Sequence, residues 1–600
     1  MLYPQDSETR QVISLDGIWN FKADKNDEGM DSKWYEKPLR DAILMPVPSS
    51  YNDITQDMEI RDLVGDVWYE RSFFIPEAAK DRRLVLRAGS ASHYARVWIN
   101  GRKVTEHKGG FLPFEAVINE YVNYAEENWV TISVNNVLDW SSLPPGYVDT
   151  FTINSDPPKE LKVQQYYHDF YNYGGIHRPV KIYTTPFSYI SDIDVNTDID
   201  GVNGFIRYKV SAEGECAKIR VKLLDESGAA VAGADSAEGL LTITGAHFWE
   251  PGNAYLYTLV AELYTPAGPV AVDRYRLPVG IRTVKATGKS LLINGRETYL
   301  KGLCKHEDFF IRGKGLDNAV NIKDFNLLKW IGANSFRTSH YPYSEEMMNL
   351  ADRYGIMVID ETPAVGLNAW DLNQPVFIPE KINKETQSHH MDVIRDLYQR
   401  DKNHPCVIMW SAANEAATNE PGAAVYFEPL IREFRQLDPT RPVTMVFYDC
   451  ANAVESNVTD MVDIICVNEY NGWYLNYGLF ELARQELSQG LQRVYDKYKK
   501  PVIMSEFGAD TINGLHQNPP VMFTEEFQTE FIKTYVELLD TFDFIIGEHI
   551  WCFADFQTKQ EVRRVVGNRK GIFTRERTPK AAAFFLKERW NNKKEAVKNI

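Results

Sequence analysis

The feature that most constrains the fold is a series of eight short apolar runs in the second half of the chain. They follow Asn294-Gly295 and alternate with stretches of helical spacing. The runs are residues 299–304, 334–338, 357–360, 406–411, 443–447, 464–467, 502–505 and 545–552. Short apolar runs of this kind are typical of strands that are buried on both faces, as in parallel sheets. Eight of them separated by helices predict a (β/α)8 TIM barrel.

A doubly wound sheet is the alternative fold. It usually needs fewer repeats, and it often carries a glycine-rich phosphate loop after its first strand. Residues 312–315 (RGKG) are rich in glycine but lack the phosphate-loop spacing, so we interpret them as a turn before a helix. Residues 344–354 keep the i, i+3, i+4, i+7 spacing of one helix face behind a serine N-cap, which agrees with the barrel.

The first part of the chain has the pattern of strands. Leu84 and Leu86 recur at a spacing of two, as do the apolar residues of 130–134, and this period predicts strands with one buried face. Asn100-Gly101 is a strong hairpin signal after the apolar residues 94–99. No helix stands out, so we predict an all-β sandwich over residues 1–184.

A second β segment follows before the barrel. Ile219, Val221 and Leu223 alternate with polar residues, and a length of about a hundred residues matches an immunoglobulin-like sandwich. The predicted domains are therefore residues 1–184, 185–285 and 286–600.

Composition excludes several classes of function. The formal net charge is −17 and no basic tract is present, which argues against nucleic acid and anionic membranes as partners. No apolar run is long enough to span a bilayer, and no signal peptide is seen. The six cysteines form no C-x-x-C pair, so we expect a reducing compartment, the cytoplasm. No metal-binding motif occurs, and we expect neither a metal nor a cofactor.

Two glutamates follow buried strands at the positions where barrels carry their chemistry. Glu415 follows the fourth predicted strand directly after Asn414, and Glu506 follows the seventh. The C-terminal ends of barrel strands converge on one face, where active sites lie. A carboxylate beside an apolar run is costly unless it is hydrogen-bonded, paired or functional.

Two converging carboxyl groups are what retaining glycoside hydrolysis requires. One attacks the anomeric carbon, while the other protonates the leaving oxygen and later deprotonates water, at a separation of about 5–5.5 Å. We assign Glu506 as the nucleophile and Glu415 as the acid and base, with the charge of Glu506 expected to raise the pKa of Glu415. Asn414 could hold the 2-hydroxyl of the sugar. The alternative is that each glutamate only ends a strand and faces water.

Several motifs resemble glycoside hydrolase family two. Residues 401–415 (DKNHPCVIMWSAANE) are similar to its acid/base signature and residues 502–508 (VIMSEFG) to its nucleophile strand. Further similar motifs are 168–170 (HDF), 338–342 (TSHYP) and 547–556 (GEHIWCFADF). The resemblance covers all three predicted domains, and it implies an N-terminal sugar-binding jelly roll, an immunoglobulin-like domain and a catalytic barrel.

The motif at 568–570 (NRK) bears on the substrate. In an extended loop, residues i and i+2 point to one side, so Asn568 and Lys570 could reach one ligand group, and their donors suit a carboxylate. The alternative is a solvated basic turn. The family resemblance implies that this motif binds the C6 carboxylate, with Arg564 in support, and hence β-glucuronidase activity. The rivals are β-galactosidase or β-mannosidase on the same scaffold, or an inactive carbohydrate-binding protein.

The resemblance also implies roles for six further residues. Trp551 would stack on the sugar, and His340 would hydrogen-bond it. Asp169, from the first domain, would reach the sugar hydroxyls. The remaining three would line the pocket after the sixth strand: Asn468, Tyr470 and Tyr474.

Size and partners remain expectations. The segment at 367–384 is shorter than in enterobacterial members of the family, which would open the cleft to larger glucuronides. The expected substrate is a small-molecule glucuronide or a glucuronic-acid-terminated oligosaccharide. We expect a homo-oligomer, with a tetramer favoured.

Overall fold

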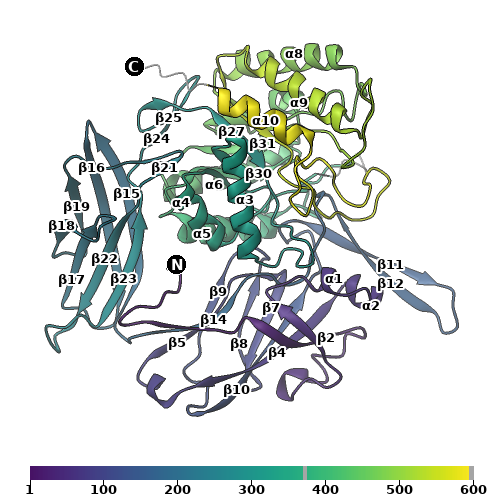
Figure 1. Ribbon diagram of the computed structural model, residues 1–600. Helices are drawn as coiled ribbons and strands as arrows, with labels where there is room; N and C mark the ends of the chain where they lie inside the picture. Colours follow the sequence, from purple (N-terminus) through teal and green to yellow (C-terminus); the bar gives the residue numbers. More distant parts are fainter. Residues whose placement is uncertain (369–373, 594–600) are drawn as a thin grey trace.

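The computed structural model describes residues 1–368 and 374–593. It confirms the predicted class: a jelly-roll sandwich, an immunoglobulin-like sandwich and a TIM barrel. In Figure 1 the barrel lies above the N-terminal sandwich, with the second sandwich to the left of both. Of the short segment predicted to open the cleft, residues 369–373 lie outside the description.

The N-terminal domain is built from two antiparallel sheets around one apolar core. The four-stranded sheet has the order β1 (Gln11–Ser14), β14 (Val180–Thr185), β5 (Arg83–Ala88) and β9 (Phe114–Val117). The six-stranded sheet has the order β3 (Ile43–Val47), β2 (Gly17–Ala23), β4 (Asp66–Ile75), β10 (Glu126–Asn135), β7 (Tyr94–Ile99) and β8 (Arg102–Lys108). The predicted hairpin at Asn100-Gly101 joins β7 to β8.

Helical turns interrupt this domain, contrary to the prediction of strands alone. They are α1 (Tyr51–Ile54), α2 (Met58–Arg61), η1 (Trp34–Glu36) and η2 (Glu77–Ala79). Each has only three or four residues, which is too short for a periodic apolar face to show in the sequence.

The prediction of one buried face per strand is wrong for β5 and β10, which are buried on both faces. On the outer side of β5, Arg87 forms ion pairs with Glu115 and with Glu345 of the barrel. The outer side of β10 lies beside Trp98 and Trp68 on the neighbouring strands, and those two rings stack at 5.4 Å. Residues from elsewhere in the chain bury these outer faces. The alternation of apolar and polar residues along a strand cannot predict such distant partners.

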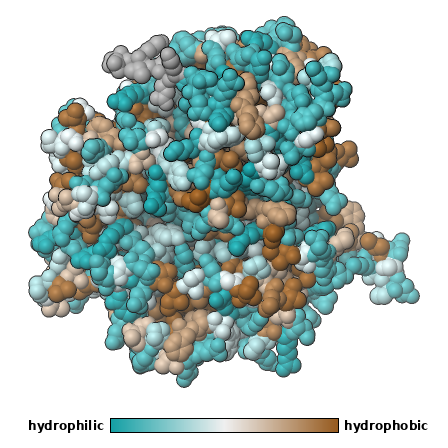
Figure 2. Space-filling view, in the orientation of Figure 1, coloured by the Kyte–Doolittle hydropathy of each residue, from teal (hydrophilic) through white to brown (hydrophobic). Residues whose placement is uncertain are grey.

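A long hairpin leaves the N-terminal domain. It consists of β11 (Gly146–Ile153) and β12 (Lys159–Tyr166) and projects from the body at the right of Figures 1 and 2. Its outer part exposes Phe151 and Leu161, which are paired across the two strands. The chain then returns to the body, so β12 leads directly into residues 166–170. The short strands β6 (Ala91–Ser92) and β13 (Gly175–Ile176) pair nearby.

The second domain is a sandwich of a three-stranded and a four-stranded sheet. The first has the order β15 (Tyr189–Asp200), β16 (Asn203–Glu213) and β19 (Glu238–Ile243), and the second β18 (Ala230–Ala234), β17 (Lys218–Leu224), β22 (Tyr257–Tyr264) and β23 (Asp273–Val279). Ile219, Val221 and Leu223 bury one face of β17, as the alternation predicted. Small strands lead to the barrel: β20 (Trp249–Glu250), β21 (Asn253–Ala254), β24 (Val284–Ala286), β25 (Leu291–Ile293) and β26 (Arg296–Glu297).

All eight predicted barrel strands are present and form a closed parallel barrel. They are β27 (Leu300–Cys304), β28 (Ser335–Arg337), β29 (Met357–Glu361), β30 (Val407–Asn414), β31 (Val443–Phe447), β32 (Ile464–Asn468), β33 (Val502–Glu506) and β34 (Ile545–Ile550). The outer helical segments are α3 (Asn318–Ile331), α4 (Glu345–Tyr354), α5 (Lys384–Asp401), α6 (Pro421–Leu437), α7 (Cys450–Glu455), η3 (Thr459–Met461), α8 (Phe480–Tyr498), α9 (Glu525–Leu539) and α10 (Ala581–Asn592).

Helix α4 shows how local signals and tertiary contacts combine. Ser344 caps it by accepting a hydrogen bond from the Met347 amide at 3.3 Å, as predicted. Met347 and Ala351 are buried under the helix. Glu345, in the first turn, has a second role, because its carboxylate binds Arg87 of the N-terminal domain. No helix in the described ranges is both long enough and apolar enough to cross a membrane.

The Arg87 ion pairs should hold the jelly roll against the barrel. We expect Arg87→Met to lower the free energy of unfolding by about 3–5 kcal/mol, because it leaves two poorly solvated carboxylates without a cation. Lys103→Met, which removes an exposed ion pair to Glu106, should cost less than about 1 kcal/mol. Urea denaturation of the two variants tests this, and equal costs would contradict it.

Candidate active site

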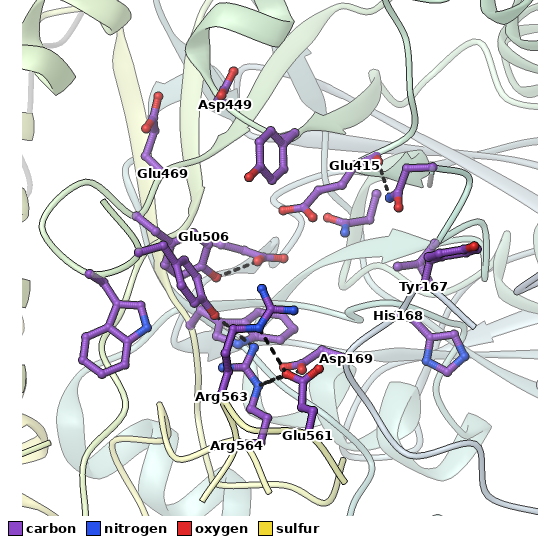
Figure 3. A pocket seen from close by; sticks show the side chains of 18 of the residues that line it. Tyr167, His168, Asp169, Glu415, Asp449, Glu469, Glu506, Glu561, Arg563 and Arg564 are labelled. Carbon is purple, nitrogen blue, oxygen red and sulfur yellow. Dashed lines mark hydrogen bonds and ion pairs between the residues drawn. The ribbon is translucent and has the colours of Figure 1, made fainter. Parts of the chain in front are cut away.

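A pocket of about 620 Å3 opens at the C-terminal ends of the barrel strands. Loops that follow several barrel strands form most of its wall, and residues 166–169 of the N-terminal domain close one side. In Figure 3 the carboxyl groups of Glu415 and Glu506 reach into the same space, while Asp169 and Arg564 meet on another side of it. The pocket is therefore shared between two domains.

Glu506 ends β33 and is 4% exposed. Its carboxylate accepts a hydrogen bond from the Tyr470 hydroxyl at 2.8 Å and forms a close ion pair with Arg337. His340 Nε2 lies 3.7 Å from the same carboxylate. Two donors, one of them cationic, stabilise the ionised form of this group.

Arg337 organises the floor of the pocket. It ends β28 and is fully buried, and its Nη1 lies 2.7 Å from both oxygens of Glu361 at the end of β29. Glu361 also accepts a hydrogen bond from Ser411 at 2.7 Å and contacts His340 Nδ1 at 3.2 Å. One guanidinium thus joins a carboxylate of the pocket to a carboxylate of the barrel interior.

Glu415 follows β30 with a left-handed backbone, φ 50°. This conformation is uncommon outside glycine and costs about 1–3 kcal/mol unless the surroundings impose it. Here Asn368 donates to the Glu415 carbonyl at 2.9 Å, and the Glu415 amide donates to Val446 at 2.9 Å. These bonds aim the side chain into the pocket.

An amide beside Glu415 has its orientation fixed. Asn468 Nδ2 donates to Glu415 Oε1 at 2.6 Å, and its Oδ1 accepts from Ser505 at 2.9 Å. The same Nδ2 lies 3.3 Å from Asn414 Oδ1, which is also 3.4 Å from Arg337 Nη1. Glu415 therefore receives a neutral donor, whereas Glu506 receives a cation.

The two glutamates are electrostatically distinct. Burial raises the pKa of Glu415 to about 7, with Asp449 and Asp169 adding to the rise. We predicted that the charge of Glu506 raises this pKa, but burial is the largest cause, and the repulsion between the two carboxyls acts on the pKa of Glu506. Burial also raises the pKa of Glu506 to about 8, against Arg337 and with help from Glu415. The two values describe the pair, which titrates as a unit. When the pair holds one proton, we assign that proton to Glu415, because Arg337 and Tyr470 stabilise the ionised form of Glu506. Such a pair can attack a carbon and protonate its leaving group.

A compact charged cluster forms the opposite wall. Arg564 donates to Asp169 at 2.8 Å and to the Tyr474 hydroxyl at 2.9 Å. Lys570 also donates to that hydroxyl at 2.9 Å and forms a close ion pair with Asp510. Although burial opposes it, Arg564 holds the pKa of Asp169 below its usual value. In these contacts two cations are paired with two anions, and Glu561 is a third carboxylate, 3.7 Å from Arg564.

The predicted site residues fall into two layers. Nine line the pocket: Asp169, His340, Asn414, Glu415, Tyr470, Tyr474, Glu506, Trp551 and Arg564. Asn468, Asn568 and Lys570 are fully buried and lie outside this lining. Asn568 donates to Asp169 at 2.6 Å, so in this state its amide supports the wall instead of being free for a ligand. Trp551 stacks on His340 at 5.0 Å.

Sequence reasoning missed Arg337, Glu361 and Asp510, which hold the residues that it found. A signal existed for the first two, because each is an ionisable residue ending an apolar barrel strand, as Glu415 and Glu506 are. Asp510 carries no comparable signal, since it lies in a loop and its role comes from contacts with Lys570 and Arg564.

Potential metal ligands meet elsewhere in the described part of the chain. Asp352, His404 and Cys406 place one ligand atom each within 4.8 Å of one another, outside the pocket lining. Asp352 already contacts His404 Nδ1 at 2.5 Å and accepts from the Cys406 amide at 2.9 Å. Despite burial, Asp352 raises the pKa of His404 to about 9, so a metal ion would have to displace a proton from the imidazole.

Known proteins match this chain along nearly its whole length. Family models match residues 12–186 (glycosyl hydrolases family 2, sugar binding domain), 188–282 (glycosyl hydrolases family 2) and 284–594 (glycosyl hydrolases family 2, TIM barrel domain). A beta-glucuronidase of Paenibacillus borealis is 52% identical over 98% of both chains. One of Homo sapiens is 47% identical over 98% of this chain and 92% of its own. The structure of a beta-D-glucuronidase of Dictyoglomus thermophilum superposes with a TM-score of 0.94 at 52% identity, covering 99% of both chains.

Proposed function

The chain belongs to glycosyl hydrolase family 2, and we propose that Glu506 is its nucleophile and Glu415 its general acid and base. The enzyme hydrolyses β-D-glucuronides to glucuronic acid and an aglycone, with retention of configuration. The observation that carries the two roles is the asymmetry of donors: Glu506 is bound by Arg337 and Tyr470, whereas Glu415 accepts from the neutral amide of Asn468.

The reaction takes two displacements. In the first, a Glu506 oxygen forms a bond to the anomeric carbon while the glycosidic C–O bond breaks, and Glu415 gives its proton to the leaving oxygen. In the second, Glu415 takes a proton from water as the water oxygen attacks the anomeric carbon and Glu506 leaves as a carboxylate. Arg337 remains cationic throughout and stabilises the charge on Glu506 whenever it is free.

The charged wall is our proposed site for the C6 carboxylate. Arg564 and Tyr474 face the pocket, and Lys570 lies directly behind them. We propose that a bound carboxylate contacts Arg564, Tyr474 and Lys570, and that Asn568 joins them when its bond to Asp169 opens. Cations without competing water bind carboxylates well.

The remaining contacts follow from the position of each side chain around the pocket. Asn414 would hold the 2-hydroxyl, and His340 and Asp169 other hydroxyls, while Trp551 presents a ring to the sugar. His340 suits this role because burial lowers its pKa to about 4, which leaves a neutral imidazole. Asn468 acts on Glu415 instead of on the sugar.

Some finer features belong to this proposal too. We propose that the enzyme works in the cytoplasm, since its six cysteines are free. We also propose that it forms a homotetramer, because the N-terminal sandwich exposes large apolar side chains such as Leu44 and Phe74. Light scattering should give four times the chain mass. The substrate is a small glucuronide or a glucuronic-acid-terminated oligosaccharide, and comparing turnover of both would decide the size preference.

We expect Glu506→Gln to lower kcat for an aryl glucuronide roughly 10³-fold or more, because an amide cannot attack the anomeric carbon. Binding of the glucuronide, measured by calorimetry, should persist. Glu469→Gln is the matched control, since Glu469 is a buried glutamate in the same wall. An undiminished rate in Glu506→Gln would mean that another group is the nucleophile.

The pH dependence should follow the shared proton. The pair titrates with apparent pKa values of about 7 and about 8. Below the lower value both carboxyls are protonated and Glu506 cannot attack, and above the higher value both are ionised and Glu415 cannot act as an acid. We therefore expect kcat/KM to peak between these values. With a leaving group that needs no acid, Glu415→Gln should lose the alkaline limb, whereas Glu469→Gln should keep it. A kcat/KM that did not change with pH would contradict the roles assigned to Glu415 and Glu506.

Recognition of the carboxylate is tested at Lys570. We expect Lys570→Ala to lower kcat/KM for an aryl glucuronide about 30- to 1000-fold, the usual loss for a buried charged contact. The glucoside with the same aglycone should change less than about tenfold. Arg563→Ala is the control, because its side chain is 65% exposed at the rim. Equal losses on both sugars would argue against recognition of the carboxylate.

A further inference from the structure

The RGKG turn at residues 312–315 is packed more tightly than a solvent-exposed turn would be. A side chain at Gly315 would lie 2.4 Å from Ser49, and one at Gly313 would lie 2.7 Å from Ser50. The Lys314 amide donates to Ser50 at 3.0 Å. This barrel loop is therefore fixed against the N-terminal domain, and Lys314 lies at the junction.

The Lys314 side chain is enclosed by aromatic rings. It is 6% exposed, and its Nζ lies 3.5 Å from the ring centroid of Tyr341, 4.4 Å from that of Phe170 and 5.7 Å from that of Phe111. Phe111 and Tyr341 stack at 4.6 Å, and Phe170 meets Tyr341 edge-on at 5.1 Å. An ammonium held over ring faces in a desolvated site is strongly attracted to them.

This cage takes the place of an ion pair. Among the described residues, no carboxylate oxygen lies within 4.0 Å of Lys314 Nζ. The nearest acidic neighbours are used elsewhere: Asp308 contacts Arg575 at 2.5 Å, and Glu307 contacts Arg178 at 3.0 Å. Burial holds the pKa of Lys314 well below its usual value, and the charges of Asp308 and Glu307 partly oppose this effect. The ring faces at 3.5 and 4.4 Å add a direct attraction for the ammonium.

Two of the rings are adjacent in sequence to pocket residues. Phe170 follows Asp169, whose carboxylate accepts from Arg564 and Asn568. Tyr341 follows His340, which contacts Glu361 and lies 3.7 Å from Glu506. Phe170 comes from the N-terminal domain and Tyr341 from the barrel, and Lys314 contacts both.

We propose that Lys314 is a positioning residue, whose charge in the Phe170–Tyr341 cage holds the Asp169 loop of the N-terminal domain at the sugar pocket. This rests on the proposed function, because Asp169 is taken to contact the sugar. Lys314 does not touch the pocket itself, so it acts through Asp169. The two glutamates are held by other contacts, and sugar binding should therefore depend on Lys314 more than the chemical step does.

The first test replaces the charge and keeps the volume. Lys314→Met should raise KM for an aryl glucuronide about 30-fold, which corresponds to a desolvated cation–π contact, with kcat changed less than about threefold. Lys314→Arg, which keeps the charge, should recover most of the affinity. Lys402→Met is the matched control, because Lys402 is also a buried lysine between domains but pairs with Asp192 and Asp194, away from the pocket. It should lower the melting temperature without raising KM.

A double-mutant cycle shows whether Lys314 acts through Asp169. Adding Lys314→Met to Asp169→Asn should raise KM by less than about threefold beyond Asp169→Asn alone. If Lys314→Met does not fold, Phe170→Leu takes its place in the same cycle. This variant removes the ring of the N-terminal domain that lies nearer to Lys314 Nζ.

Two results would overturn the proposal: a KM in Lys314→Met within about twofold of the wild type, or effects that multiply in full in the double variant. A wild-type enzyme that left glucuronides intact would instead contradict the proposed function.

Discussion

The pocket depends on one buried cation, the guanidinium of Arg337. Placing a charge in a barrel interior is expensive, and removing one partner of such a pair typically costs about 3–5 kcal/mol. The cost is offset here because Arg337 binds the carboxylates of Glu361 and Glu506 together. A single side chain thereby ties the barrel interior to the proposed nucleophile. Glu361 in turn contacts Ser411 and His340, so the arrangement connects four strands, β28, β29, β30 and β33.

The second constraint is that the pocket is closed by another domain. Asp169 comes from the chain that returns from the β11–β12 hairpin, and it meets Arg564 from the loop after β34. Contacts such as Arg87 with Glu345 hold the two domains together at a distance from the pocket. Stability of the interface and geometry of the site are therefore linked, since displacing the jelly roll would remove Asp169 from the charged wall.

Much of this architecture could be predicted from the sequence, because its causes are local. The eight barrel strands are short apolar runs, and Glu415 and Glu506 stand out as acids after them. What could not be predicted depends on distant partners. The outer face of β5 is buried by Arg87 and its partners, and Lys570 is buried behind Tyr474 and Arg564. Likewise, burial proved to be the main cause of the raised pKa of Glu415, and burial is a property of the whole fold.

The balance of charge in the wall opposite the glutamates affects how selectivity can evolve. Arg564 and Lys570 are neutralised by Asp169 and Asp510 before any ligand arrives. A sugar without a carboxylate therefore leaves no unpaired buried cation behind when it binds. Binding of such a sugar lacks one favourable contact but does not leave a buried charge unpaired. Discrimination against it is therefore weaker than it would be if its binding left an unsatisfied charge. The wall can thus be retuned toward neutral sugars in small steps, without first passing through a destabilised protein.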